Sequence, residues 1–130
     1  MPSGFRILAF VVLFLGMTIN SISAAPAETP AVRTMAEILV NLNHFPSNAD
    51  KARLKTLAGE KTTTAHERVV AQALLNVQHK VNSEDLPKLQ AVTKDASAPE
   101  SVKTLANVVI NLNHTPSEGE KEKLKKLATQ

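Results

Sequence analysis

Along most of the chain, apolar residues recur at intervals of three and four, which places them on one face of an α-helix. Three strongly apolar segments, residues 30–44, 65–79 and 99–114, each end on a histidine. A more polar segment follows each of them and carries a pair of leucine or valine residues, such as Leu54 and Leu57. The pattern predicts an all-α fold of six helices, in which each apolar helix forms a hairpin with the polar helix after it.

The helical pattern repeats with a fixed period. The sequence "NLNH" ends at His44 and again at His114, and the related "NVQH" ends at His79, so that the three histidines are 35 residues apart. Residues 34–59 match residues 104–129 at 13 of 26 positions. A period of this size is typical of repeated supersecondary units. We therefore expect one domain, residues 28–130, with units at about 29–62, 63–96 and 97–130.

The period and the hairpin type resemble those of tetratricopeptide repeats. The resemblance extends no further, because the Trp, Leu, Gly and Tyr pattern of that family's first helix is missing, and we assign no family on this basis. Stacked hairpins of this kind contact only their neighbours in the chain. The period thus predicts a short right-handed solenoid, and a closed six-helix bundle is the alternative.

Capping signals support these helix positions. Thr64 with Glu67, and Ser97 with Glu100, have the spacing of capping boxes before two of the apolar helices. Proline is tolerated in the first turn of a helix but not in its interior. Pro87 therefore predicts that the second helix of the middle unit either begins late, with Asp85 as its cap, or is kinked. Capping boxes are also expected at the other two polar helices, at Ser47 with Asp50 and at Ser117 with Glu120.

Each apolar helix carries one narrow polar stripe, because residues four and then three positions apart share a helix face. Two interpretations are open. The stripe is the solvent edge of a buried helix, where Asn and His hydrogen-bond backbone groups at the helix end, or it is part of a binding surface formed by three aligned stripes. The residues of the three stripes are Glu37, Asn41, His44, Gln72, Asn76, His79, Asn107, Asn111 and His114.

The three repeated histidines raise the question of a metal site. Zinc needs nitrogen ligands at about 2 Å, whereas packed helices lie about 8–10 Å apart. An open stack of hairpins therefore predicts no metal site and no cofactor. Only a closed bundle, or a pair of molecules, would bring the histidines together. The fourth histidine beyond residue 27, His66, is expected to be a surface residue.

The first 27 residues have the pattern of a secretory signal peptide. Arg6 precedes a short apolar run, residues 7–19, and small residues lead to a suitable cleavage site after Ala27 or Ala25. The run is shorter than the roughly 20 residues of a membrane span. We expect an exported protein, periplasmic or secreted, with no span in the mature chain. Because the chain has no cysteine, packing alone must stabilise the domain.

Composition argues against several function classes. The formal charge of +3 is too small to indicate nucleic-acid binding, and Phe45 is the one aromatic residue after residue 27. Four glycines in the whole chain form no phosphate-binding loop. These observations predict no enzyme but a binding or scaffold module for an envelope protein or peptide. The alternative is a metal-binding or metal-responsive envelope protein that uses the repeated histidines.

Overall fold

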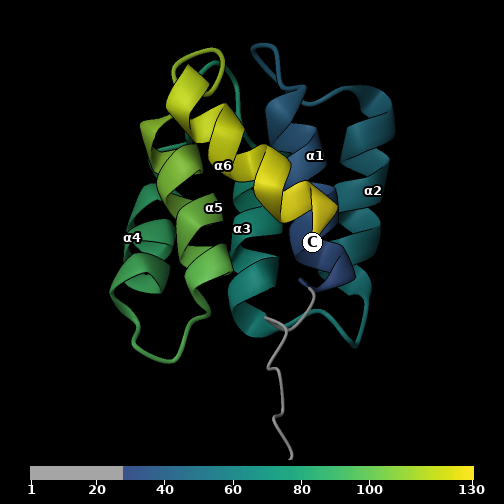
Figure 1. Cartoon of the computed structure of the whole chain (residues 1–130), viewed down its shortest axis with the longest axis vertical. Coiled ribbons are helices and arrows are strands. Elements are labelled where there is room, and N and C mark those ends of the chain that lie inside the picture. The colour runs from purple at the N-terminus through teal and green to yellow at the C-terminus, as the bar shows by residue number, and fades with distance from the viewer. Residues whose placement is uncertain (1–27) are drawn as a thin grey trace, which may run out of the picture.

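The computed structural model describes residues 28–130, and within this range the chain is all-helical (Figure 1). The predicted signal peptide, residues 1–27, lies outside the described residues. No helix among residues 28–130 combines the length and the apolar character that crossing a membrane requires. The helices are α1 (Pro30–Val40), α2 (Asn48–Gly59), α3 (Ala65–Leu75), α4 (Leu86–Lys94), α5 (Glu100–Asn111) and α6 (Glu118–Thr129).

The three apolar helices α1, α3 and α5 lie at the centre and contact one another. The three polar helices surround them, and each packs mainly on the central helix of the next unit rather than on that of its own. Thus α2 lies on α3 and α4 lies on α5. Helix α6 crosses back to lie on α1 (Figure 1). This cyclic order gives the domain an approximate threefold symmetry.

The contact between α6 and α1 closes the chain on itself, so the open ends of the predicted solenoid are absent from residues 28–130. The closed six-helix bundle, the alternative arrangement, describes the structure. The physical reason is burial, because an open stack of only three units would leave the apolar surface of its first and last helices in water. Closure instead covers α1 with α6.

A single apolar core runs through the bundle. The central helices supply most of it, since each presents apolar side chains around most of its circumference. Each polar helix adds a narrow stripe of apolar side chains to this core. The predicted pairs of leucine and valine residues are buried, except that Leu127 of α6 is only partly buried. The buried apolar residues of these outer helices are Leu54, Leu57, Leu89, Val92 and Leu124.

The predicted capping boxes are confirmed at α3 and α6, half formed at α2 and wrong at α5. At α2, Ser47 accepts a hydrogen bond from the backbone of Asp50, but the Asp50 side chain does not bond back. Thr64 accepts a hydrogen bond from the backbone of Glu67, whose side chain bonds back to Thr64, forming a capping box. The capping box predicted at Ser97 and Glu100 is not formed. Pro99 occupies the N-cap position of α5, and the Ser97 side chain bonds Asp95 instead. The predicted late start of α4 is confirmed, with Asp85 as N-cap and proline in the first turn.

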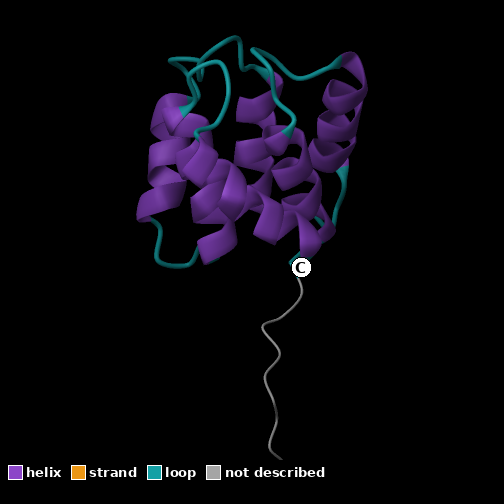
Figure 2. Cartoon of the chain, turned by 45° about the horizontal axis from the view of Figure 1, so that its top comes forward, coloured by secondary structure: helices purple, strands orange, loops and turns teal. Residues whose placement is uncertain are grey.

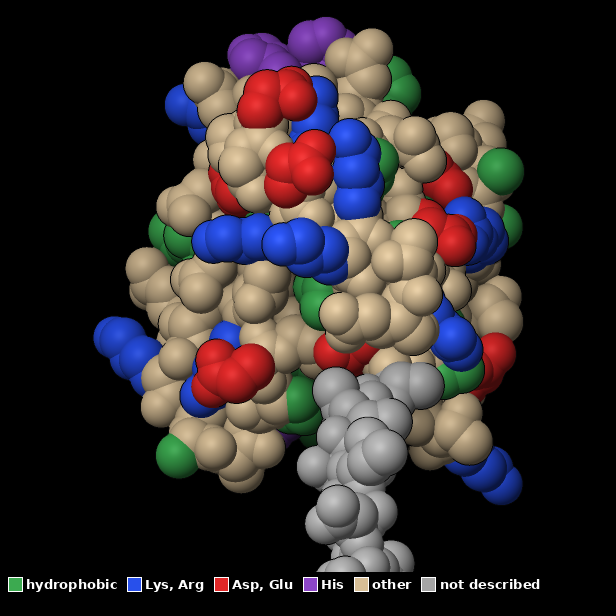
Figure 3. Space-filling model, in the orientation of Figure 1, with side chains coloured by type: hydrophobic (Ala, Val, Ile, Leu, Met, Phe, Trp, Pro, Cys, Tyr) green, Lys and Arg blue, Asp and Glu red, His purple; other side chains and the backbone are tan. Residues whose placement is uncertain are grey.

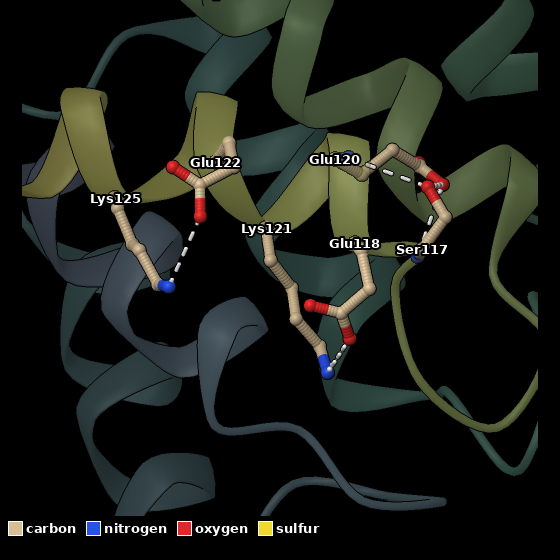
Figure 4. Close-up of polar contacts among 6 residues, drawn as sticks. All are labelled: Ser117, Glu118, Glu120, Lys121, Glu122 and Lys125. Atoms are coloured by element: carbon tan, nitrogen blue, oxygen red, sulfur yellow. Dashed lines mark hydrogen bonds and ion pairs between the residues drawn. The ribbon is translucent and has the colours of Figure 1, made fainter.

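Helix α6 shows how local pairs support the most polar of the outer helices (Figure 4). Ser117 and Glu120 form the predicted capping box at its start. Ion pairs three residues apart then follow on its exposed side, Glu118 with Lys121 at 3.0 Å and Glu122 with Lys125 at 3.3 Å. Each such pair adds only a few tenths of a kcal/mol, about 0.2–0.5. The position of α6 must therefore depend on its apolar contact with α1.

Replacing Leu124, the one fully buried residue of α6, tests this closure. Because its side chain has no exposed surface, Leu124→Ala should lower the free energy of unfolding by about 2–5 kcal/mol. Denaturant unfolding followed by circular dichroism measures the change, with the exposed neighbour Lys123→Ala as control. Similar small effects of both variants would contradict a buried contact at this position.

The turn between α4 and α5 gives a second prediction, through Asp95. Hydrogen bonds from the Ser97 side chain, and then the contact with His66 Nε2 at 2.9 Å, lower the pKa of Asp95 below its ordinary value. A carboxyl group with a lowered folded-state pKa stabilises the fold above its unfolded-state pKa, and the stabilisation is lost as pH falls. Asp95→Asn should therefore lower the melting temperature at pH 7 but much less at pH 2.

The matched control for this pH series is Glu84→Gln, which neutralises an exposed carboxylate elsewhere on the surface. The melting temperature of Glu84→Gln should differ little from that of the wild type at both pH values. If the difference in melting temperature between Asp95→Asn and the wild type is the same at pH 2 and pH 7, the charge of Asp95 does not stabilise the fold.

Candidate metal centre

The three repeated histidines lie beyond the ends of the central helices. Helices α1 and α3 end four residues before His44 and His79, and α5 ends three residues before His114. The sequence pattern had placed all three histidines on their helices, which is wrong. They belong to the loops that gather at one end of the bundle (Figure 2).

All three histidines adopt the same unusual backbone conformation. Their φ angles are 67° for His44, 64° for His79 and 67° for His114, and they are the described non-glycine residues with positive φ. This region favours glycine, because a Cβ atom crowds the backbone there. Strained residues of this kind cluster at functional sites. A histidine at each position indicates that its side chain, rather than its backbone, is required.

Each histidine is the central residue of a γ-turn, in which the amide after it donates to the carbonyl before it. The γ-turn with positive φ is rare and strained. Its effect is to reverse the chain within three residues and to direct the histidine outward from the turn. The donor and acceptor pairs are Phe45 N and Asn43 O at 2.8 Å, Lys80 N and Gln78 O at 2.6 Å, and Thr115 N and Asn113 O at 2.8 Å.

A ring of backbone hydrogen bonds joins the three turns. The amide of His44 donates to the carbonyl of His114 at 2.9 Å, His79 donates to His44 at 2.6 Å, and His114 donates to His79 at 2.8 Å. Each unit thus bonds to the other two around the approximate threefold axis. The bond from His44 to His114 spans 70 residues and exists only because the bundle is closed.

The side chains converge on the same axis. The Nδ1 atoms of His44 and His114 are 2.9 Å apart, those of His79 and His114 are 3.0 Å apart, and those of His44 and His79 are 3.2 Å apart. The three rings are inclined to one another by 60–82°. We call this cluster the histidine triad. His44 is half-buried and the other two are exposed, at the end of the molecule that is uppermost in Figure 3.

The spacing of the Nδ1 atoms matches that of three ligands on one metal ion. Nitrogen ligands at about 2.0–2.1 Å from zinc lie about 2.8–3.4 Å apart, from octahedral to tetrahedral geometry. The three separations in the triad fall within this range. Separations of a helix packing distance were predicted for an open stack. They do not apply, because the bundle is closed and the turns carry the histidines off their helices to the axis.

No placement of protons on the three rings lets every pair of Nδ1 atoms in the triad form a hydrogen bond. Each Nδ1 has a single position in the plane of its ring, which holds either one proton or one lone pair. Among three mutually close nitrogens, at least two therefore present the same kind of group to each other, and they repel. A cation at the axis accepts all three lone pairs together. The triad is thus suited to bind a metal ion.

The other six residues of the predicted stripes are exposed, as expected for a solvent edge, and three of them form side-chain contacts within their own unit. The Asn41 side chain donates to the Glu37 carbonyl at 3.0 Å, and the Glu37 carboxylate pairs with Arg53 at 2.8 Å. The Asn76 side chain donates to the buried Asp85 at 2.9 Å. Only the histidines of the stripes are brought together. The full set of six is Glu37, Asn41, Gln72, Asn76, Asn107 and Asn111.

A cavity of about 300 Å³ adjoins the triad and was not expected from the sequence. It is lined by Phe45, Lys51, Gln78 and His79. The available signal was a break in the repeat, because Phe45 corresponds to a lysine and a threonine in the other units. Comparisons with known proteins find no matching family model, curated protein or solved structure.

Replacing His79 by glycine separates the role of the side chain from that of the backbone. Glycine adopts positive φ without strain, and the change also relieves the crowding of the Nδ1 atoms. In metal-free protein, His79→Gly should therefore raise the free energy of unfolding by about 1 kcal/mol. Thermal unfolding in the presence of a chelator measures the effect.

The control is Gln78→Gly, at the exposed position just before His79, where φ is not positive. There glycine should lower stability by about 0.5–1 kcal/mol through its greater freedom in the unfolded chain. Equal losses for both variants would show that His79 is unstrained and stabilises the fold by itself.

Proposed function

We propose that the protein binds one divalent transition-metal ion through the Nδ1 atoms of His44, His79 and His114. The observation that supports this most directly is the mutual approach of these atoms to 2.9–3.2 Å. The ring of backbone hydrogen bonds joins the three turns without using the Nδ1 atoms, so it would hold the ligands in place and lower the entropic cost of binding. The strained turns are consistent with the same role.

The ligand set narrows the class of metal. Imidazole nitrogen suits zinc, copper and nickel, whereas calcium and magnesium prefer oxygen ligands. Thiolate ligands are excluded, because the chain has no cysteine. Imidazole also resists the oxidation that inactivates thiolates. This property would suit the predicted export to the periplasm or the medium.

The exposure of the triad indicates exchangeable binding. Structural zinc sites are closed by four protein ligands, while sites with three ligands leave a position for water or another molecule. His79 and His114 are exposed, so solvent can reach the ion. We infer a role in holding, carrying or sensing metal rather than in stabilising the fold.

We infer binding rather than catalysis. Hydrolytic zinc sites pair the metal with a general base, commonly a carboxylate. The charged side chains that line the cavity at His79 and the cavity at its neighbours Gln78 and Lys80 are Lys51 and Lys80. The protein or peptide partner expected from the sequence stays a prediction. Metal binding is supported better, because it uses the residues that the fold brings together.

Titration with Zn²⁺ and with Co²⁺ as a spectroscopic probe tests the proposal. The wild type should bind one equivalent, with the ring resonances of three histidines shifted. Single alanine variants of His44, His79 or His114 should lose affinity by about 100-fold or more, since each removes a ligand itself rather than a residue that only orients a ligand. Affinity should also fall toward pH 5, because protons compete for the same nitrogens.

His66→Ala is the matched control, because His66 contacts Asp95 and lies in the first turn of α3, at the opposite end of that helix from the triad. It should leave the stoichiometry and the affinity unchanged. If the triad resonances do not move at stoichiometric metal, or if His66→Ala weakens binding as much as the triad variants, the proposal is wrong.

A further inference from the structure

We propose that the cavity lined by Phe45, Lys51, Gln78 and His79 binds the ring of a small aromatic anion that also coordinates the ion. The expected ligand class is a planar chelator with carboxylate and hydroxyl oxygens. This inference rests on the proposed metal site, because the anion would take the coordination positions that the triad leaves open. The protein would then bind a metal–chelate complex rather than a bare ion.

The position of the cavity is the first observation. His79 is both a member of the triad and a lining residue, so a ligand in the cavity would contact one of the three proposed metal ligands. The volume of about 300 Å³ is at the lower end of the range for small-molecule sites. A second cavity of about 390 Å³ shares Lys51 and Gln78 with the first.

The second observation is the chemistry of the lining. Phe45 is 54% exposed, and it is the large apolar side chain that the described part of the chain exposes most clearly. The Lys51 ammonium lies 5.8 Å from the centroid of the Phe45 ring, within the range of a cation–π contact. An aromatic face and a positive charge are thus held together at the cavity. This pair suits a ligand that is both aromatic and anionic.

The third observation is a departure from the repeat. Phe45 corresponds to Lys80 and Thr115 in the other units, and Lys51 corresponds to Leu86 and Lys121. The combination of Phe and Lys therefore occurs in the first unit alone. Neither the helical repeat nor the triad, which is symmetric, requires it.

The charge of the site favours an anion. Three imidazole ligands are neutral, so a divalent ion would keep its full charge at the triad. The charged residues lining the adjoining cavities, Lys51 and Lys80, are positive as well. An anionic oxygen ligand would offset this charge, while water would not. Chelation through two oxygens would fill two of the open positions at once.

Salicylate is a suitable probe, and the Co²⁺-loaded full chain is the protein to use. Cobalt absorption reports a change in coordination, and the nonaromatic chelator lactate is the ligand control. In the wild type, salicylate should shift the cobalt spectrum and should bind about five to ten times more tightly than lactate. Phe45→Ala should abolish this preference, and Lys51→Ala should weaken both anions. Lys55→Ala, an exposed lysine on the same helix, should change neither.

Cobalt stoichiometry and affinity are measured first in every variant, which separates the two proposals. One equivalent of bound cobalt with no response to salicylate would overturn the chelate proposal and leave the metal site standing. The same holds if Phe45→Ala keeps the preference for salicylate. Doubling of the molecular mass on adding metal would also overturn it, because a second copy would then occupy the open positions. Absence of cobalt binding would overturn both.

Discussion

The packing of α6 on α1 brings the third unit beside the first, and the histidine triad depends on this contact. Without it, His114 would lie at the far end of a stack from His44, and their backbone hydrogen bond over 70 residues could not form. Apolar burial supplies the driving force, with Leu124 fully buried on the closing helix. A hydrophobic contact on one side of the bundle thus decides the geometry of a polar cluster at its end.

The polar cluster has features that the fold does not need for stability. Three strained γ-turns and three crowded Nδ1 atoms raise the free energy of the folded chain when no metal is bound. Glycine at each of these positions would adopt the positive φ angle without strain. With an ion at the axis, the three Nδ1 lone pairs would form coordinate bonds to it instead of repelling one another. In the proposed site, stability and metal binding would thus be opposed at the triad.

Symmetry distinguishes the two parts of the proposed site. The triad follows the repeat, since each unit contributes one histidine in the same conformation. The adjoining cavity departs from the repeat, because Phe45 and Lys51 have no equivalent pair in the other units. A symmetric cluster is sufficient to hold a spherical ion. Selecting one planar ligand requires an asymmetric neighbour, which the first unit provides.

The sequence by itself determined the six helices, their apolar faces and the equivalence of the three units, because periodicity and capping are local properties. It also singled out His44, His79 and His114 through their spacing. Only the tertiary structure decided that the chain closes and that these histidines meet. The closing contact and the positive φ angles arise from packing between units, which the pattern of any single helix does not contain. The site is therefore composed of residues visible in the sequence, in an arrangement that only the folded chain defines.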